Sequence, residues 1–268
     1  MKKILTIITV FLFWQSCFAQ ADTSFRLLKT FPGEIADAAI DNLDNIYILS
    51  NTDQLKKYNA AGDSLAVYNN VRRFGKIFSI DVSNPLKVLL YYKDFSSIVV
   101  LDRLLATRSN IDLRRKNILQ AAAIGQSYDN NIWVFDGFDN KLKKIDDEGN
   151  ILLETPDFRQ ALGESITPQQ IIDQNNQVYI HDAAKGIYVF DRYGTFKRKF
   201  PLQGWQSVNI TDKQILGISN QSLQAYNIST LMQSEQKFPG NFAPYYRYYL
   251  RNNKLVALSK ESLDIYRY

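Results

Sequence analysis

The sequence predicts an all-β fold: a six-bladed β-propeller of four-stranded antiparallel blades, closed by the N-terminal strand completing the last blade. Three observations lead to this prediction. A strand-rich unit recurs six times along the chain, and the residue choice favours strands, with 16 Tyr and 16 Phe beside 12 Gly. A segment that resembles the end of such a unit also stands alone near the N-terminus. Units of about 40 residues with four strands each are typical of propeller blades.

Residues 1–19 have the three parts of a secretory signal. Lys2 and Lys3 precede an apolar run at residues 4–14, and a small-residue site ends at Ala19. The run is too short to span a bilayer, which takes about 20 apolar residues. We therefore expect a signal peptide over residues 1–19, a single propeller domain over residues 20–268, and export to the periplasm or the outer membrane.

Cys17 allows an alternative, in which the signal is cut before this cysteine and a lipid on Cys17 anchors the protein to a membrane. Trp14 stands where such signals usually carry leucine, which favours cleavage after Ala19. In that case the only cysteine leaves with the signal, and the mature chain has no disulfide or thiol chemistry. Removal of Lys2 and Lys3 with the signal takes the formal net charge from +5 to +3, which is too small to argue for nucleic acid, and 46% apolar residues suffice for a core.

The second strand of each unit gives the alignment. It is predicted at NIYIL (45–49), KVLLY (87–91), NIWVF (131–135), QVYIH (177–181), QILGI (214–218) and KLVAL (254–258). An apolar segment that ends in an Asx-rich turn precedes each of these runs and is predicted as the first strand. The aspartates that recur at this turn are Asp41, Asp81, Asp129, Asp173 and Asp212.

The third strand supports the same alignment, because each copy has an aliphatic residue and then a large apolar residue three positions later. In five units an Asn or Asp follows: Asn59, Asp102, Asp146, Asp191 and Asn227. Such side chains accept hydrogen bonds from backbone amides two residues on and so begin tight turns. The turn predicts a fourth strand after it.

The sixth unit stops at Tyr268 after its third strand. The fourth strands of units four and five end in KRKFP (197–201) and QKFPG (236–240), and RLLKTFPG at residues 26–33 resembles these endings. We therefore expect the N-terminal segment to supply the outer strand of the last blade. This pairing closes the ring and covers open sheet edges.

The third unit resembles the NHL-type six-bladed β-propeller family. The motifs are NIWV at 131–134, DNKL at 139–142 and IDDEG at 145–149. As a fold, the resemblance covers nearly the whole mature chain. Relatives with this fold include lyases and lactone hydrolases, so the resemblance implies that a metal in the central channel is one alternative, held by histidines or by Glu, Asn and Asp.

The sequence does not supply a zinc site of the lyase type. It has one histidine, His181, whereas a catalytic zinc takes three protein ligands such as His₃ or His₂Glu. The aspartates at the first turns are expected to form turns around one rim, whereas calcium needs six to eight oxygens at one point. We find no phosphate loop or nucleophile elbow. The sequence therefore predicts no cofactor, no metal site and no enzymatic activity.

Two predicted links from an outer strand to the next inner strand are basic. VRRFGK (71–76) and DLRRKN (112–117) occupy nearly equivalent positions in adjacent blades, so their cations are expected to form one patch: Arg72, Arg73, Lys76, Arg114, Arg115 and Lys116. Arginine forks favour carboxylate or phosphate partners. The alternative is a solvated rim that keeps the protein soluble.

Aromatic residues in equivalent links extend the candidate partner-binding set to Trp205, Tyr245 and Tyr246. Tyr, Trp and Arg are enriched where binding energy concentrates. The leading hypothesis is a non-catalytic, exported propeller that binds a protein with an acidic surface in a cell-envelope assembly. The alternatives are a channel-centred enzyme of the lyase or lactonase type with bound calcium, and a binder of glycans or small anionic ligands.

Overall fold

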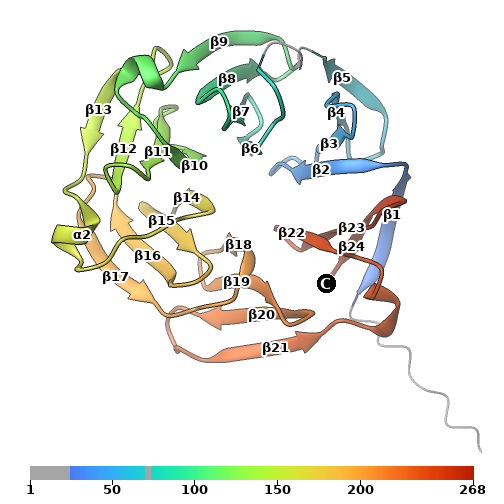
Figure 1. The fold of residues 1–268 in the computed structure, drawn as a ribbon. Helices are drawn as coiled ribbons and strands as arrows, with labels where there is room; N and C mark the ends of the chain where they lie inside the picture. Colours follow the sequence, from blue (N-terminus) through green and yellow to red (C-terminus); the bar gives the residue numbers. More distant parts are fainter. Residues whose placement is uncertain (1–24, 70–73) are drawn as a thin grey trace, which may run out of the picture.

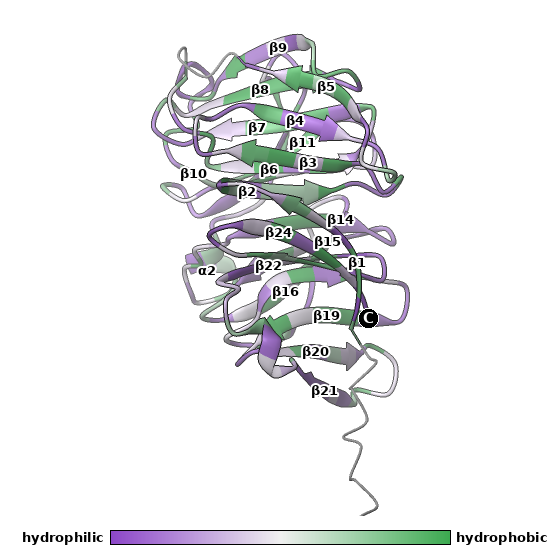
Figure 2. Cartoon of the chain, turned by 90° about the vertical axis from the view of Figure 1, so that its right-hand side faces the viewer, coloured by the Kyte–Doolittle hydropathy of each residue, from purple (hydrophilic) through white to green (hydrophobic). Residues whose placement is uncertain are grey.

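The computed structural model describes residues 25–69 and 74–268. Within them, six sheets of four strands stand around a common centre, as Figure 1 shows, and Figure 2 gives the edge-on view of the ring. The predicted six-bladed propeller is confirmed. No helix in these two stretches is both long and apolar enough to cross a membrane.

Each of the first three blades is an antiparallel meander of consecutive strands. Blade 1 contains β2 (Ile35–Ile40), β3 (Ile46–Ser50), β4 (Leu55–Tyr58) and β5 (Ser64–Tyr68). Blade 2 contains β6 (Ser79–Asn84), β7 (Lys87–Tyr92), β8 (Ser97–Asp102) and β9 (Thr107–Asp112). Blade 3 contains β10 (Ala121–Gln126), β11 (Ile132–Asp136), β12 (Lys141–Ile145) and β13 (Ile151–Glu154). Between blades 2 and 3 lies the 3₁₀ turn η2 (Arg114–Lys116).

Blades 4 and 5 repeat this order. Blade 4 contains β14 (Gln170–Gln174), β15 (Gln177–Asp182), β16 (Gly186–Asp191) and β17 (Phe196–Phe200), after the short helix α2 (Phe158–Ala161). Blade 5 contains β18 (Gln206–Ile210), β19 (Gln214–Ser219), β20 (Ser222–Asn227) and β21 (Gln233–Lys237). Blade 6 follows the 3₁₀ turn η3 (Gly240–Phe242) and contains β22 (Arg247–Arg251), β23 (Lys254–Leu258) and β24 (Ser262–Arg267).

The outer strand of blade 6 is β1 (Arg26–Pro32), from the opposite end of the chain. It pairs antiparallel with β24, from Arg26 opposite Arg267 to Pro32 opposite Ser262. Figure 1 shows β1, in blue, beside the red C-terminal strands. Closure of the ring by the N-terminal strand is therefore confirmed.

The core consists of apolar clusters between neighbouring blades, and β7 shows how a strand contributes to two of them. Successive side chains of a strand point to opposite faces. Val88 and Leu90 pack toward blade 1, whereas Leu89 and Tyr91 pack toward blade 3. All of β7 is buried as a result. Hydrophobic runs rather than alternating patterns are what a strand buried on both faces requires.

The meander order gives the molecule two different faces. Turns between first and second strands, and between third and fourth strands, belong to one face, which we call the hairpin face. The connection face carries the turns between second and third strands and the links that enter each first strand. Both predicted basic links are of the second type, because they run from β5 to β6 and from β9 to β10.

Candidate functional site

The predicted basic patch is only partly assembled among the described residues. Arg72 and Arg73 lie outside them. Lys76 and Arg114 are exposed, and the Arg115 side chain is 86% exposed beside Asp112, with 3.2 Å between Nε and Oδ2. Lys116 instead donates from Nζ to Oδ1 of Asn150 in blade 3, at 2.9 Å.

The cations that do gather meet at the turn between β7 and β8. Arg114 donates from Nη2 to the backbone oxygen of Asp94 in this turn, at 3.2 Å. Lys76 and Lys93 line one cavity together with Asp94. Within residues 25–69 and 74–268, none of these three cations is in an ion pair with a carboxylate. Lys93 was not in the predicted set, although its place in a connection-face turn could have indicated it.

Two exposed phenylalanines stand beside these cations. Nζ of Lys93 lies 4.7 Å from the ring centre of Phe78, and 49% of Phe78 is exposed. Phe95, in the turn after β7, is 52% exposed. We call Lys76, Phe78, Lys93, Phe95 and Arg114 the connection-face cluster.

The structure corrects the placement of Trp205. Its side chain is only 3% exposed and packs in the cluster between blades 4 and 5. A Cβ on Gly217 would stand 2.4 Å from Cε3 of Trp205, so the indole covers the β19 backbone. The link that carries Trp205 passes over the interface between blades 4 and 5, and the indole is buried there.

The two tyrosines of the same prediction have different surroundings. Tyr245 is half-buried in an aromatic cluster, where its hydroxyl donates to Oδ2 of Asp264 at 2.8 Å and lies 2.7 Å from the hydroxyl of Tyr266. Burial raises the pKa of Tyr245. Tyr246 is 55% exposed, and its hydroxyl reaches the backbone oxygen of Ile35 in blade 1 at 3.5 Å. Tyr245 therefore belongs to the closure of the ring, and Tyr246 remains on the surface.

A cavity of about 630 Å³ opens on the connection face among blades 6, 1 and 2. Ligand pockets commonly have volumes of about 300 to 1,000 Å³. Its lining comes from the first strands of blades 1 and 6, from Leu49 in β3, from turns between second and third strands, and from the link before β6. The charged lining residues are Asp37, Asp53, Lys76, Lys93, Asp94 and Arg247.

Asp37, Tyr249 and Arg247 form a connected group at this cavity. Tyr249 donates its hydroxyl to Oδ1 of Asp37, which also accepts the amide of Ala38 at 2.8 Å. Arg247 donates from Nη1 to the Tyr249 hydroxyl at 3.4 Å, and the same nitrogen lies 3.7 Å from Oδ1 of Asp37. The Asp37 side chain is 18% exposed and the Arg247 side chain 50% exposed.

The electrostatics of this group follow from its partial burial. Burial raises the pKa of the Asp37 carboxyl, and the hydrogen bond from Tyr249 acts in the opposite direction. Burial, with the nearby Asp37 charge, also raises the pKa of Tyr249, so this hydroxyl stays protonated and donates. A titratable group with a raised pKa in a cleft marks a candidate site. The sequence does not indicate this group, because Asp37 and Tyr249 come from opposite ends of the chain.

His181 lies near the end of β15, opposite Gln170 and Ile187, and is 2% exposed with Nε2 3.0 Å from the backbone oxygen of Trp205. Burial lowers the pKa of His181. Among residues 25–69 and 74–268, no group of three or more His, Cys, Asp and Glu side chains is arranged to hold a metal ion.

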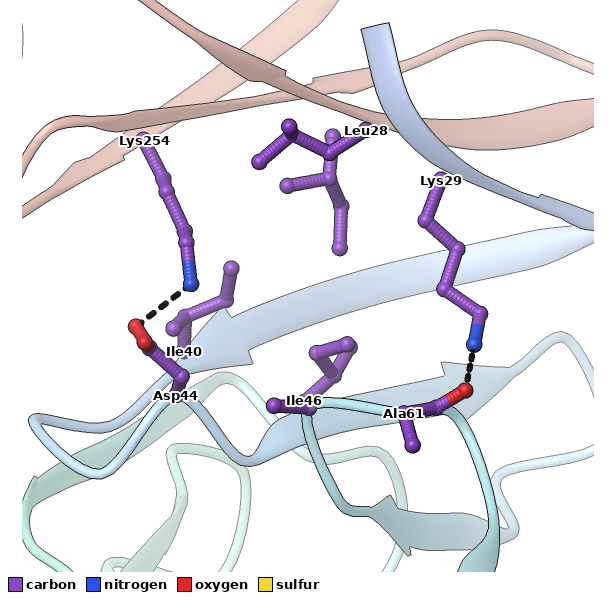
Figure 3. Close-up of a pocket in the computed structure, with 9 residues that line it drawn as sticks. Leu28, Lys29, Ile40, Asp44, Ile46, Ala61 and Lys254 are labelled. Atoms are coloured by element: carbon purple, nitrogen blue, oxygen red, sulfur yellow. Dashed lines mark hydrogen bonds and ion pairs between the residues drawn. The ribbon is translucent and has the colours of Figure 1, made fainter.

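A second cavity, of about 300 Å³, lies on the hairpin face where blade 6 meets blade 1 (Figure 3). Lys254 of blade 6 pairs with Asp44 of blade 1, with 2.7 Å between Nζ and Oδ1. On the other side of the cavity, Lys29 of β1 donates to the backbone oxygen of Ala61 in blade 1. Because both polar contacts cross the junction between the first and last blades, this cavity belongs to the closure of the ring.

No protein-family model matches the sequence, and no curated protein matches it either. Solved structures do match. A catalytically inactive variant of virginiamycin B lyase from Staphylococcus aureus, with quinupristin, has a TM-score of 0.63 at 11% identity, over 90% of this chain and 99% of that chain. The WD40 domain of Neurospora crassa Pan2 has a TM-score of 0.61 at 11% identity, over 88% of this chain and 79% of that chain.

A protein of Bacteroides fragilis described as exported also matches, with a TM-score of 0.60 at 10% identity over 91% of this chain and 94% of that chain. At these identities the likeness shows the fold alone. The propeller part of the predicted resemblance is therefore confirmed, and the narrower assignment to NHL-type propellers stays a prediction.

The prediction that this chain is not an enzyme is wrong as an exclusion. It rested on missing zinc ligands and on the absence of known catalytic motifs. Virginiamycin B lyase is an enzyme, and its structure matches almost the whole ring of this chain. One fold supports many unrelated functions, so the architecture found here is compatible with catalysis as well as with binding.

Proposed function

We propose that the chain is an exported β-propeller of the cell envelope whose connection face binds a partner protein with an acidic surface. The pattern of residues 1–19 supports export. The observation that carries the binding proposal is the convergence of Lys76, Lys93 and Arg114 from three separate segments at one turn, without carboxylate partners among the described residues.

The chemistry of the connection-face cluster fits a protein partner. Unpaired cations attract an acidic surface over a distance and increase the association rate, whereas exposed aromatic rings supply contact area. Phe78 and Phe95 provide such rings beside the cations. The cluster therefore combines the two kinds of group that an interface with an acidic protein uses.

The test is capture of partners from detergent-solubilised envelope with the full chain, followed by a binding titration of the captured protein. Reversal of Arg114 and Arg115 to Glu, alone and together with R72E and R73E, is expected to weaken binding and to flatten its salt dependence. Exposed charges change folding stability by only about 0.5 kcal/mol each, so the variants should remain folded.

A matched control reverses two exposed cations of the hairpin face, R103E and K213E. Both variants lose the same positive charge, so a general effect of net charge would weaken them equally. Selective loss with the Arg114 and Arg115 reversals supports the proposal. If every variant binds the partner as tightly as the parent does, the cations form only a solvated rim and the proposal is overturned.

A further inference from the structure

The cavity on the connection face has charges of both signs on its wall. Among the residues that the structure describes, three cations and three carboxylates line it: Lys76, Lys93 and Arg247, and Asp37, Asp53 and Asp94. A simple anion or a simple cation would meet like charges on part of this wall, and like charges in one site repel. A ligand that carries one positive and one negative charge can place each of them beside a side chain of opposite charge.

Asp37 provides the negative pole. Its hydrogen bonds from Tyr249 and Ala38 both fall on Oδ1, and Oδ2 has no partner among the described residues. This unpartnered oxygen is not fully buried, so solvent or a ligand can reach it. Burial raises the pKa of the Asp37 carboxyl, and a charged donor such as an ammonium group at Oδ2 stabilises its ionised form.

Arg247 provides the positive pole. Its Nη1 is held by the hydroxyl of Tyr249, and half of the side chain remains exposed at the cavity. A guanidinium presents several N–H donors in a rigid fork that matches a carboxylate. The ammonium groups of Lys76 and Lys93 lie on the same wall and add to the positive potential there.

Tyr249 connects the two poles. It donates to Asp37 and accepts from Arg247, so both charged groups are held by one ring. A polar group that is held by its neighbours before a ligand arrives loses less entropy on binding. We propose that this cavity binds a small zwitterionic ligand, with its ammonium group at Asp37 and its carboxylate at Arg247.

Lys76, Phe78 and Lys93 belong both to this cavity and to the connection-face cluster, whereas Arg114 and Arg115 do not line the cavity, so reversal of these two arginines separates this inference from partner binding. The test is isothermal titration of the full chain with triglycine and, as a second zwitterion, 6-aminohexanoate. N-acetyl-triglycine and triglycine amide each remove one charge from the first probe. We expect both to bind at least about tenfold more weakly, since a charge-assisted hydrogen bond is lost.

Variants assign each pole. D37N should weaken triglycine about tenfold or more and leave the binding of N-acetyl-triglycine unchanged, because this probe has no ammonium group. R247Q should also weaken triglycine about tenfold or more, and it should leave the binding of triglycine amide unchanged, because this probe has no carboxylate. Lys93 is exposed, so K93Q should remain folded. It should also weaken the binding of triglycine. D212N and R198Q, which lie outside the cavity, are controls that should bind as the parent does.

Three results would overturn the inference. The first is no binding of either zwitterion at concentrations up to about 10 mM, where even a weak site would be occupied. The second is equal affinity for triglycine and its two singly charged forms. The third is unchanged binding in D37N, R247Q and K93Q. Partner capture is measured separately, with the parent chain and with the Arg114 and Arg115 reversals, and neither of these arginines lines the cavity.

Discussion

Single carboxylates and amides define the turns of this propeller. Asp102 accepts the amides of Leu104 and Ala106 at 2.8 and 2.9 Å, and Asp191 accepts those of Tyr193 and Thr195 at 3.0 and 2.9 Å. The sequence pattern predicted this role, because an Asx side chain bonds the backbone shortly after it. The same local chemistry makes these residues sensitive to pH.

Asp102 gives a prediction with a definite sign. The amides of Ala106 and Leu104 lower the pKa of its carboxyl. Its stabilising contribution is therefore present above about pH 4, the unfolded value, and is lost as pH falls through the lower folded pKa. D102N keeps one acceptor oxygen but not the charge. Its melting temperature should lie below that of the parent at pH 6, and the gap should close toward pH 2.5. A gap that stays constant with pH would contradict this account.

Other aspartates act across blades, which the sequence did not reveal. Asp173 of blade 4 accepts the indole Nε1 of Trp133 at 3.0 Å and the amide of Tyr128 at 3.2 Å, both in blade 3. Asp81 of blade 2 accepts the amide of Gln126 in blade 3 at 2.8 Å. The sequence predicts only the turns that these aspartates form. Partners some 40 residues away depend on how neighbouring blades pack, and one sequence does not show that packing.

At the scale of the element, the second strands were predictable and the links between blades were not. A run such as KVLLYY at β7 identifies a strand buried on both faces. The links carry aromatic residues that differ in burial: Trp205 is buried, whereas Phe78 is half exposed. Their burial depends on neighbouring strands. The cavity was also unpredictable, because Asp37 and Arg247 meet only when the ring is closed.

Gly217 in β19 tests the packing of one such link. A Cβ at this position would stand 2.4 Å from Cε3 and 3.0 Å from Cδ2 of Trp205. G217A should therefore destabilise the protein by about 1 to 3 kcal/mol, the usual cost of overpacking. Chemical denaturation measures this difference.

The matched control is G240A, because a Cβ on Gly240 would meet nothing within 4 Å. This change should leave stability the same or raise it by about 0.4 to 1 kcal/mol, through reduced freedom of the unfolded chain. Equal effects of the two substitutions would show that Trp205 does not restrict β19.

For the whole molecule, closure joins residues from both ends of the chain. Gly33 donates its amide to the backbone oxygen of Glu261 at 2.8 Å, just beyond the β1 pairing. Leu27 and Leu28 of β1 are 51% and 39% exposed and contribute little to the core. The apolar contacts come from Phe25, which is 9% exposed between blades 5 and 6, and from Phe31, which packs against blade 1.

Deleting residues 20–32 should therefore destabilise the ring severely. Loss of a buried Phe side chain alone costs about 3 to 5 kcal/mol, against a net stability of about 5 to 15 kcal/mol for a domain. The deletion also exposes the unpaired backbone groups of β24. We expect a much lower melting temperature or aggregation, and partial recovery when a peptide of residues 24–34 is added. A truncated protein that melts like the parent would show that the ring does not depend on β1.

The most direct test of the proposed binding face is site-specific photocrosslinking in intact cells. Phe95 and Leu86 are exposed by 52% and 63% and lie in turns at opposite ends of the strands of blade 2. A photoreactive residue at position 95 should crosslink an acidic envelope protein, and the same residue at position 86 should not. Crosslinks to that protein from position 86 alone, or equally from both positions, would contradict binding through the connection face.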